Sequence, residues 1–234
     1  MRPVDKGPDQ GVFNPYTNAQ QLLVTHIGEY CSYSERWIAS AIHVEHKLPK
    51  NDYPNEKFLW ANFLLSCSNC NSGKGYGNLE LVDYLWPDMD NTFLAFCYDS
   101  EGRVSVSQDL DANLFEKAQR TWIMLGLNRH PDRFTIGLIK PTNKDRRWLH
   151  RKEEWQKALH QKQGLTELDT PERRESIVET AAARGMFSVW MTVFNNDSDI
   201  RKRLIKRFTG TAIGCFDEEG SPISRLGGQL LFMK

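Results

Sequence analysis

Residues 42–50 of this chain read IHVEHKLPK, and two further stretches follow, WANFL at residues 60–64 and CSNCNSGKG at residues 67–75. The first stretch alternates in polarity as a strand does, and Pro49 stops it because proline cannot donate to a sheet ladder. A polar loop rich in proline and asparagine separates it from the apolar second stretch. The third stretch ends on glycine, which is typical of a short helical turn. The order strand, loop, strand, helix predicts a ββα unit.

The predicted bounds are residues 41–47 for the first strand, 58–65 for the second strand and 70–75 for the helical turn. The ββα unit then occupies about residues 40–78. A short amphipathic helix is expected before it, at residues 20–28, because its apolar positions recur at helical spacing.

The pattern changes from strands to helices near residue 110. Residues 93–98 and 103–107 flank Asp-Ser-Glu-Gly at 99–102, which predicts a β-hairpin. Asp197 precedes a basic stretch and has the residue type of an N-cap. The expected helical or apolar stretches are residues 114–126, 148–164, 177–194 and 197–207. We therefore expect an α+β fold with a core at residues 1–108 and a largely helical region at residues 109–234.

Composition restricts the class of protein. Hydrophobic residues make up 40% of the chain and charged residues 26%, which excludes wholesale disorder. No run approaches the roughly 20 apolar residues that a membrane-spanning helix needs. The first residues, MRPVDKGPDQGVF, lack the apolar core of a signal peptide. We expect a cytoplasmic protein without membrane contact.

The charges are unevenly spread along a chain whose net charge is zero. Residues 1–110 hold 8 Lys and Arg against 14 Asp and Glu, and residues 111–234 hold 22 against 16. Basic clusters within the second part lie at residues 146–152, interleaved with Trp148, and at residues 201–207. Such clusters suit phosphate binding, but a solvated helix face or a docking surface gives the same pattern.

The residues of the ββα unit suit phosphodiester hydrolysis. This reaction needs a base that takes a proton from water near neutral pH, and the imidazole of His46 suits that role. It also needs a hard divalent cation, which prefers oxygen ligands such as those of Glu45 and Asn71. Asn62 would brace the loop that holds the imidazole, and Lys74 would contact the phosphate.

At these positions the sequence resembles the HNH endonucleases, also called ββα-metal nucleases. His46, Asn62 and Asn71 match the three positions that name the family, with asparagine in place of the final histidine, and Glu45 matches the residue before the first. The resemblance implies an endonuclease in which His46 activates water. It implies also that Glu45 and Asn71 bind one Mg²⁺ or Mn²⁺ ion and that Asn62 positions the loop of His46. We assign His43 to structure or to phosphate contact, since it would face away from His46 in a strand.

A closer resemblance extends to about residue 135. The phrases VEHKLPK, WANFLLSCSNCNSGKG and RTWIMLGLNRHPDR are similar to a bacterial HNH branch that includes the PtuB-like nuclease subunit of Septu anti-phage systems, some of them linked to retrons. This similarity implies an effector of antiviral defence that acts with an ABC-type ATPase, the PtuA-like subunit. The helical region would then dock this partner, contact nucleic acid, or do both.

The five cysteines argue against a disulfide framework, since their number is odd. Members of the family often carry two Cys-x-x-Cys pairs that hold a structural zinc ion. Here the second pair is present as Cys67 and Cys70, whereas the first reads Cys31-Ser-Tyr-Ser34. Serine is a poor zinc ligand, which leaves Cys31, Cys67 and Cys70 as candidates. Either zinc is absent and packing replaces it, or a fourth ligand comes from elsewhere in the chain.

Several functions stay open at this stage. The leading hypothesis is an HNH endonuclease, and the sequence does not choose between DNA and RNA, because such a site contacts the backbone phosphate. An RNA-directed nuclease that cleaves tRNA is therefore an alternative. A second alternative is a non-catalytic module that keeps the HNH fold for binding, although an intact set of Glu45, His46, Asn62 and Asn71 counts against it. A third is a stand-alone homing or restriction nuclease, which would need a DNA-reading element that the sequence does not show.

Overall fold

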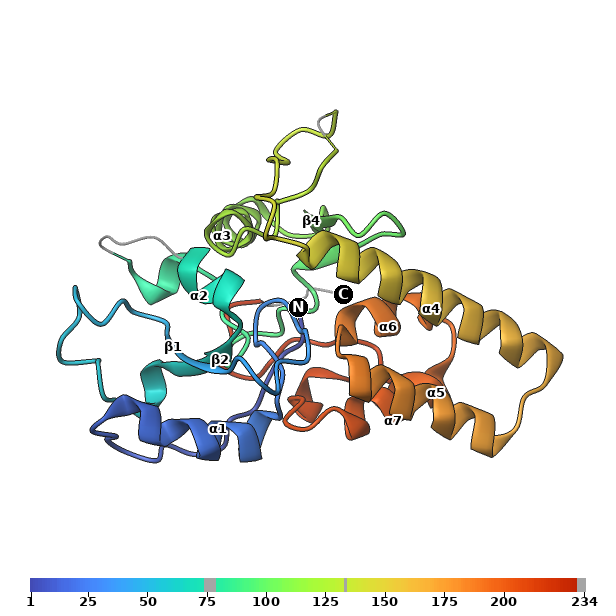
Figure 1. Cartoon of the computed structure of the whole chain (residues 1–234), viewed down its shortest axis with the longest axis horizontal. Helices are drawn as coiled ribbons and strands as arrows, with labels where there is room; N and C mark the ends of the chain where they lie inside the picture. Colours follow the sequence, from blue (N-terminus) through green and yellow to red (C-terminus); the bar gives the residue numbers. More distant parts are fainter. Residues whose placement is uncertain (74–78, 133, 231–234) are drawn as a thin grey trace.

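The computed structural model describes residues 1–73, 79–132 and 134–230, and these form an α+β fold. The ββα unit lies at one side of the molecule, and the helices of residues 147–207 lie at the other, with the N-terminus between them (Figure 1). The helices and strands in chain order are α1 Gln20–Ile27, β1 His43–His46, β2 Phe63–Ser66, α2 Ser68–Gly73, β3 Phe96–Tyr98, β4 Val104–Val106, α3 Ala112–Met124, α4 Arg147–Glu167, α5 Pro171–Arg184, α6 Phe187–Val193 and α7 Ser198–Arg207, with short 3-10 turns at Tyr16–Ala19, Trp60–Asn62, Leu81–Asp83 and Ile213–Cys215.

The predicted ββα unit is confirmed. Strands β1 and β2 pair antiparallel, with His43 opposite Ser66 and His46 opposite Phe63. Helix α2 follows β2 after a single residue and packs against β1. The predicted hairpin is confirmed as well, since β3 and β4 pair antiparallel around the turn at residues 99–102.

Strand β2 starts later than the sequence predicts, at Phe63 instead of residue 58. The residues before it form a 3-10 turn, Trp60–Asn62, whose backbone carbonyls are bound by a lysine. The Lys6 ammonium donates to the carbonyl oxygens of Trp60, Ala61 and Phe63 at 2.9–3.0 Å. The carbonyl oxygens of Trp60 and Ala61 thus bind a side chain, and the strand begins only after this turn.

The apolar stretch at residues 177–194 is divided between two helices. Helix α5 ends at Arg184, and α6 begins at Phe187. Gly185 lies between them with a φ of +82°, and a Cβ atom there would come within 2.4 Å of the Glu35 carbonyl oxygen. A contact with a residue so far away in the sequence is not visible in an apolar pattern, and it is what separates the two helices.

The other predicted helices form close to their expected bounds. Asp197 is the N-cap of α7, and its Oδ1 accepts from the Ile200 amide at 3.0 Å, as predicted. In α3 the predicted apolar face is buried, with Leu114, Ala118 and Trp122 at most 7% exposed.

The buried apolar side chains form two clusters. One draws on residues 1–127 together with Leu230, so that α3 packs with the ββα unit. The other draws on residues 158–216 together with Tyr30. Tyr98 packs against both clusters. Within the second half, α4 contacts α5 and α6, and α5 contacts α7.

Glu35 joins the two clusters. Its side chain is 3% exposed, and its carboxylate accepts from the Arg2 amide at 2.6 Å and from the amide and hydroxyl of Ser188 at 2.7 and 2.6 Å. Its backbone carbonyl accepts from the Met186 amide at 2.8 Å. A buried carboxylate is costly unless it is fully hydrogen-bonded. The loop before the ββα unit and the first turn of α6 therefore form one hydrogen-bonded junction.

We expect Glu35→Gln to lower the free energy of unfolding by about 2–4 kcal/mol, because an amide NH₂ would face the donors that now bind a carboxylate oxygen. Urea unfolding measures this loss. Glu218→Gln, an exposed residue, is the matched control and is expected to change the stability by less than about 0.5 kcal/mol. Equal midpoints for the two variants would contradict the importance of this junction.

Candidate functional site

The end of β1 places a carboxylate and an imidazole side by side in sequence and on opposite faces of the strand. Glu45 is buried, with 3% of its surface exposed, and His46 is partly buried. Asn71 lies on α2, which packs against β1, and its side chain is exposed. The fold therefore brings the elements that carry all three residues into contact.

The His46 ring is held in one orientation. Its Nε2 atom lies 2.9 Å from the Lys57 carbonyl oxygen. The edges of two aromatic rings flank it, with centroid distances of 4.6 Å to Tyr16 and 5.2 Å to Phe63. A carbonyl oxygen only accepts, so Nε2 carries the hydrogen and the lone pair of the neutral ring is on Nδ1. This tautomer assigns the basic atom of the ring to Nδ1.

Asn62 binds the loop between β1 and β2 at three points. Its Oδ1 accepts from the Leu48 amide at 2.7 Å, and its Nδ2 donates to the carbonyl oxygens of Leu48 and Glu56 at 3.0 and 3.2 Å. The Asn62 carbonyl oxygen also accepts from the Lys47 amide. Because Lys57, the partner of His46, belongs to the same loop, these bonds restrict the position of the imidazole.

Two residues are predicted to contact the substrate, His43 and Lys74. Lys74 lies outside the described residues. His43 is exposed, and its Nε2 lies 3.2 Å from the Ser68 hydroxyl at the start of α2. This contact ties the first residue of β1 to the helix that carries Asn71.

A buried ion cluster beneath the site was not predicted from the sequence. The Asp88 carboxylate binds the ammonium groups of Lys47 at 2.7 Å and Lys6 at 2.9 Å, and all three side chains are at most 10% exposed. Burial alone would raise the pKa of Asp88, but the two ammonium groups outweigh burial and lower it. Lys47 directly follows His46, so the end of β1 is fixed to the segment around residue 88.

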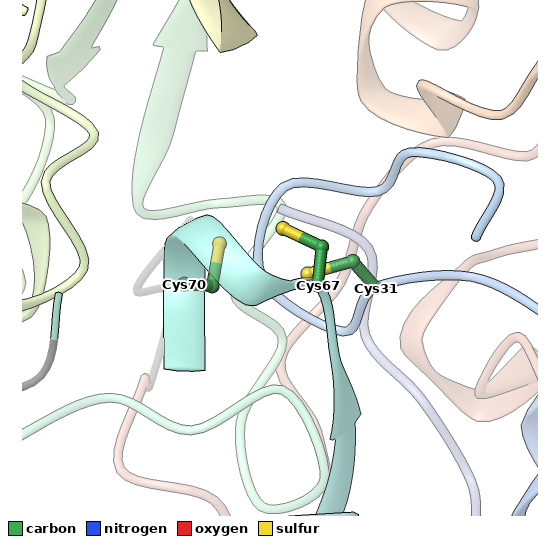
Figure 2. A group of neighbouring side chains, drawn as sticks. All are labelled: Cys31, Cys67 and Cys70. Carbon is green, nitrogen blue, oxygen red and sulfur yellow. The ribbon is translucent and has the colours of Figure 1, made fainter. Parts of the chain in front are cut away.

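Three cysteines come together next to the ββα unit. Cys67 directly follows β2, Cys70 lies in α2, and Cys31 comes from the loop that precedes β1 (Figure 2). All three are buried, and their Sγ atoms lie within 4.8 Å of one another. Ser34, the residue in place of a fourth cysteine, has its hydroxyl 3.6 Å from the Cys67 Sγ.

The donor chemistry of this cluster fits a zinc ion at three of its four positions. Thiolates on one tetrahedral zinc ion lie about 3.8 Å from one another. Hydrogen bonds from Cys31 and Cys70 lower the pKa of Cys67, with a further contribution from Arg36. By contrast, burial raises the pKa of Cys31 to about 11, and bonds to the other thiols raise that of Cys70. Cys67 is thus the first of the three to ionise.

Two of the four cations in the basic cluster at residues 146–152 are buried and do not face solvent. Arg147 is 2% exposed, and its guanidinium donates to Asp145, to the carbonyl oxygens of Leu125 and Gly126, and to the Cys70 Sγ at 3.3 Å. Arg151 is 3% exposed and donates to the Gly102 carbonyl oxygen. The sequence pattern suggested exposed cations, whereas these two guanidinium groups satisfy buried acceptors.

The second basic cluster is largely paired with acidic residues. Arg203 binds Asp199 and Glu175, and Arg207 binds Glu179 through two hydrogen bonds. The pairs with Glu175 and Glu179 join α7 to α5. Lys202 and Lys206 are exposed on the same helix.

We expect purified protein to contain one zinc ion per chain, because three thiol donors already lie close together. Cys67→Ser is expected to lose the ion and to unfold at a lower temperature, since metal binding stabilises the folded state. Elemental analysis and thermal unfolding, with and without a chelator, measure both effects. Cys97→Ser, at an exposed cysteine outside the cluster, is the control. Metal-free wild-type protein, with a midpoint that the chelator leaves unchanged, would show that the thiols pack without metal.

The comparisons with known proteins concern the ββα unit. Residues 29–77 match the family model of the HNH endonucleases, and no curated protein matches the chain. The matched segment contains Glu45, His46, Asn62 and Asn71. No helix of the described residues is long and apolar enough to cross a membrane. The chain therefore carries an HNH endonuclease segment, which supports a nuclease-type function and nucleic-acid binding.

Proposed function

We propose that this protein is a metal-dependent endonuclease that hydrolyses phosphodiester bonds, with His46 as the general base. The observation that carries the proposal is the fixed orientation of His46 at the end of β1, where Nε2 donates to the Lys57 carbonyl oxygen. This bond directs the basic Nδ1 atom away from the loop. The HNH match at residues 29–77 covers the same residues.

The proposed reaction begins with proton transfer from water to His46 Nδ1. The neutral imidazole accepts this proton at its unprotonated ring nitrogen. The resulting hydroxide attacks phosphorus, a new P–O bond forms, and the bond to the leaving oxygen breaks. Asn62 keeps the imidazole in place throughout, since it binds the loop that contains Lys57.

Glu45 and Asn71 are the proposed ligands of the catalytic cation. Their carboxylate and amide oxygens are hard donors, which Mg²⁺ and Mn²⁺ prefer, and packing of α2 on β1 brings their elements together. When bound, such a cation stabilises the negative charge that develops on the phosphate oxygens. His43 and Lys74 are proposed to contact the substrate phosphate.

We propose further that the nuclease is the effector of an anti-phage defence complex with an ABC-type ATPase. The similarity of the phrases around residues 44–75 and 120–133 to PtuB-like subunits supports this role. The paired and buried arginines of the second half support docking over broad nucleic-acid contact for α4 and α7, because these guanidinium groups already bind acceptors of the protein and leave mainly Lys202 and Lys206 exposed outside these pairs on α7. The substrate is DNA or RNA, with tRNA as the RNA alternative.

We expect His46→Ala to slow cleavage by a factor of about 10²–10⁴, because the variant loses the base that deprotonates water. The assay uses plasmid DNA, total cellular RNA and tRNA with Mg²⁺ or Mn²⁺, with the protein alone and with its co-purifying partner. His160→Ala, an exposed histidine on α4, is the control and is expected to cleave as wild type does.

Cleavage by His46→Ala at the wild-type rate would refute the assignment of the base. A folded, partner-bound wild-type protein that cleaves none of the substrates would favour the non-catalytic binding module. If His46→Ala loses the cleavage of only one of the polymers that the wild type cuts, that polymer is the substrate of this site.

We expect Asn71→Ala to raise the concentration of Mg²⁺ or Mn²⁺ needed for half-maximal cleavage at least tenfold, which is about the size of the effect when a metal site loses a supporting group. Asn71→Asp keeps an oxygen donor and is expected to restore most of the metal affinity. Asn51→Ala, in the exposed loop before β2, is the control. An unchanged metal titration for Asn71→Ala would remove Asn71 from the ligand set.

A further inference from the structure

A cavity lined by both polar and apolar side chains lies where the second half of the chain meets the ββα unit. Its volume is about 530 Å³, within the range of small-molecule sites. The residues that line it come from the segment after the cysteine loop, from the start of α2, from α4 and from the end of α5. They include Arg36, Trp37, Ser68, Asn69, His150, Glu154 and Arg184.

The Arg36 guanidinium is held within this cavity by both parts of the molecule. Its Nη2 donates to the Asn69 Oδ1 of α2 at 3.1 Å, and its Nη1 lies 3.3 Å from the His150 Nδ1 of α4. The adjacent Trp37 has 54% of its surface exposed. A rigid loop therefore presents a flat aromatic side chain at the cavity.

Glu154 lines the cavity and carries a buried acceptor atom that lacks a partner in the described part of the protein. The residue is 3% exposed, and its Oε1 accepts from the Arg184 Nε. Its Oε2 is buried and has no hydrogen-bond partner among the described residues. A buried acceptor without a partner is unfavourable, so this oxygen is suited to a donor from outside the protein.

The cavity is close to the proposed catalytic residues. Ser68 lines it, and the Ser68 hydroxyl lies 3.2 Å from the Nε2 atom of His43. His43 precedes His46 by three residues on β1, which corresponds to about 10 Å along the strand. A nucleic-acid chain at His46 thus has a neighbouring nucleotide within reach of the cavity.

We propose that the cavity binds one unpaired nucleobase of the substrate, stacked on Trp37, with an exocyclic amino group of the base donating to Glu154 Oε2. The inference rests on the proposed nuclease function and adds a substrate class, single-stranded or locally unpaired nucleic acid. An unpaired base exposes the edge that carries its amino group, and aromatic side chains bind such bases by stacking.

The charges that line the cavity balance, because Glu153 and Glu154 are matched by Arg36 and Arg184, so no net positive charge draws a phosphate into it in preference to a neutral base. Arg184 has 43% of its side chain exposed, so it is placed at the rim. It is therefore suited to the phosphate that follows the bound base.

The test measures binding of labelled single strands by fluorescence anisotropy, with every protein in the His46→Ala background so that the ligand stays intact. The probes are DNA and RNA oligomers of equal length that carry cytosine, thymine or uracil, or an abasic site, together with a duplex. We expect cytosine oligomers to bind more tightly than thymine or uracil oligomers, and the abasic oligomer and the duplex to bind least well.

Two variants assign the contacts. Trp37→Ala is expected to weaken binding of the cytosine oligomer on the order of tenfold, the effect of losing one stacked base. Glu154→Gln keeps an oxygen for Arg184 but presents an NH₂ group to the base, so the preference for cytosine should be lost or reversed. The controls are Phe134→Ala, which is 99% exposed and outside the cavity, and Glu167→Gln, which is exposed at the end of α4. Unfolding midpoints of the variants equal to that of the His46→Ala parent would exclude misfolding.

Unchanged affinity and base preference in both variants would overturn the proposal, as would equal binding of the abasic and cytosine oligomers or a lack of binding to any probe. The nuclease proposal is tested separately by cleavage. Base-selective binding that depends on Trp37, in a wild-type protein that does not cleave, would support the cavity and refute catalysis. Cleavage that depends on His46, with binding indifferent to Trp37 and Glu154, would support catalysis and refute the cavity.

Discussion

The buried carboxylate of Glu35 is the constraint on which the arrangement of the site depends. It binds backbone and hydroxyl donors from the N-terminal segment and from α6, and the same loop carries Cys31 before it and Arg36 after it. The position of the three thiols and the position of the cavity wall therefore follow from one junction. Because the donors come from residues 2 and 188, the two halves must be packed together before the loop has its final shape.

The loop around His46 is fixed by a second, independent set of contacts. Asn62 binds its backbone, and Asp88 binds Lys47 from below, so both ends of the segment between β1 and β2 are held. A general base works only when its basic atom faces the water it deprotonates. For His46, the proposed base, the hydrogen bond to the Lys57 carbonyl oxygen sets the direction of Nδ1. The contacts that hold the loop also hold this oxygen in place. The buried polar contacts thus fix the orientation of the His46 imidazole.

The sequence predicts the elements that depend on neighbouring residues, but it does not reveal the contacts between residues far apart in the chain. Periodicity and turn residues gave β1, the β3–β4 hairpin, α3 and the Asp197 cap, since each depends on neighbours within a few residues. The burial of Arg147 against Cys70, 77 positions earlier, and the bond from Ser188 to Glu35 have no local signal. The roles of the site residues stay predictions, because they concern substrate and metal.

Helix α2 contributes residues to the cavity, to the cysteine cluster and to the proposed metal site. Its first turns carry Ser68 and Asn69 in the cavity, Cys70 against Arg147 of α4, and Asn71 as the proposed metal ligand. A displacement of α4 would be transmitted to α2 through the Arg147–Cys70 contact and through Asn69, which binds Arg36 beside His150 of α4. The helical half is thus joined by side-chain contacts to the helix that carries Asn71, the proposed metal ligand. A partner of the proposed kind that docked on the helical half would act on Asn71 through these contacts, without contact to the proposed substrate site.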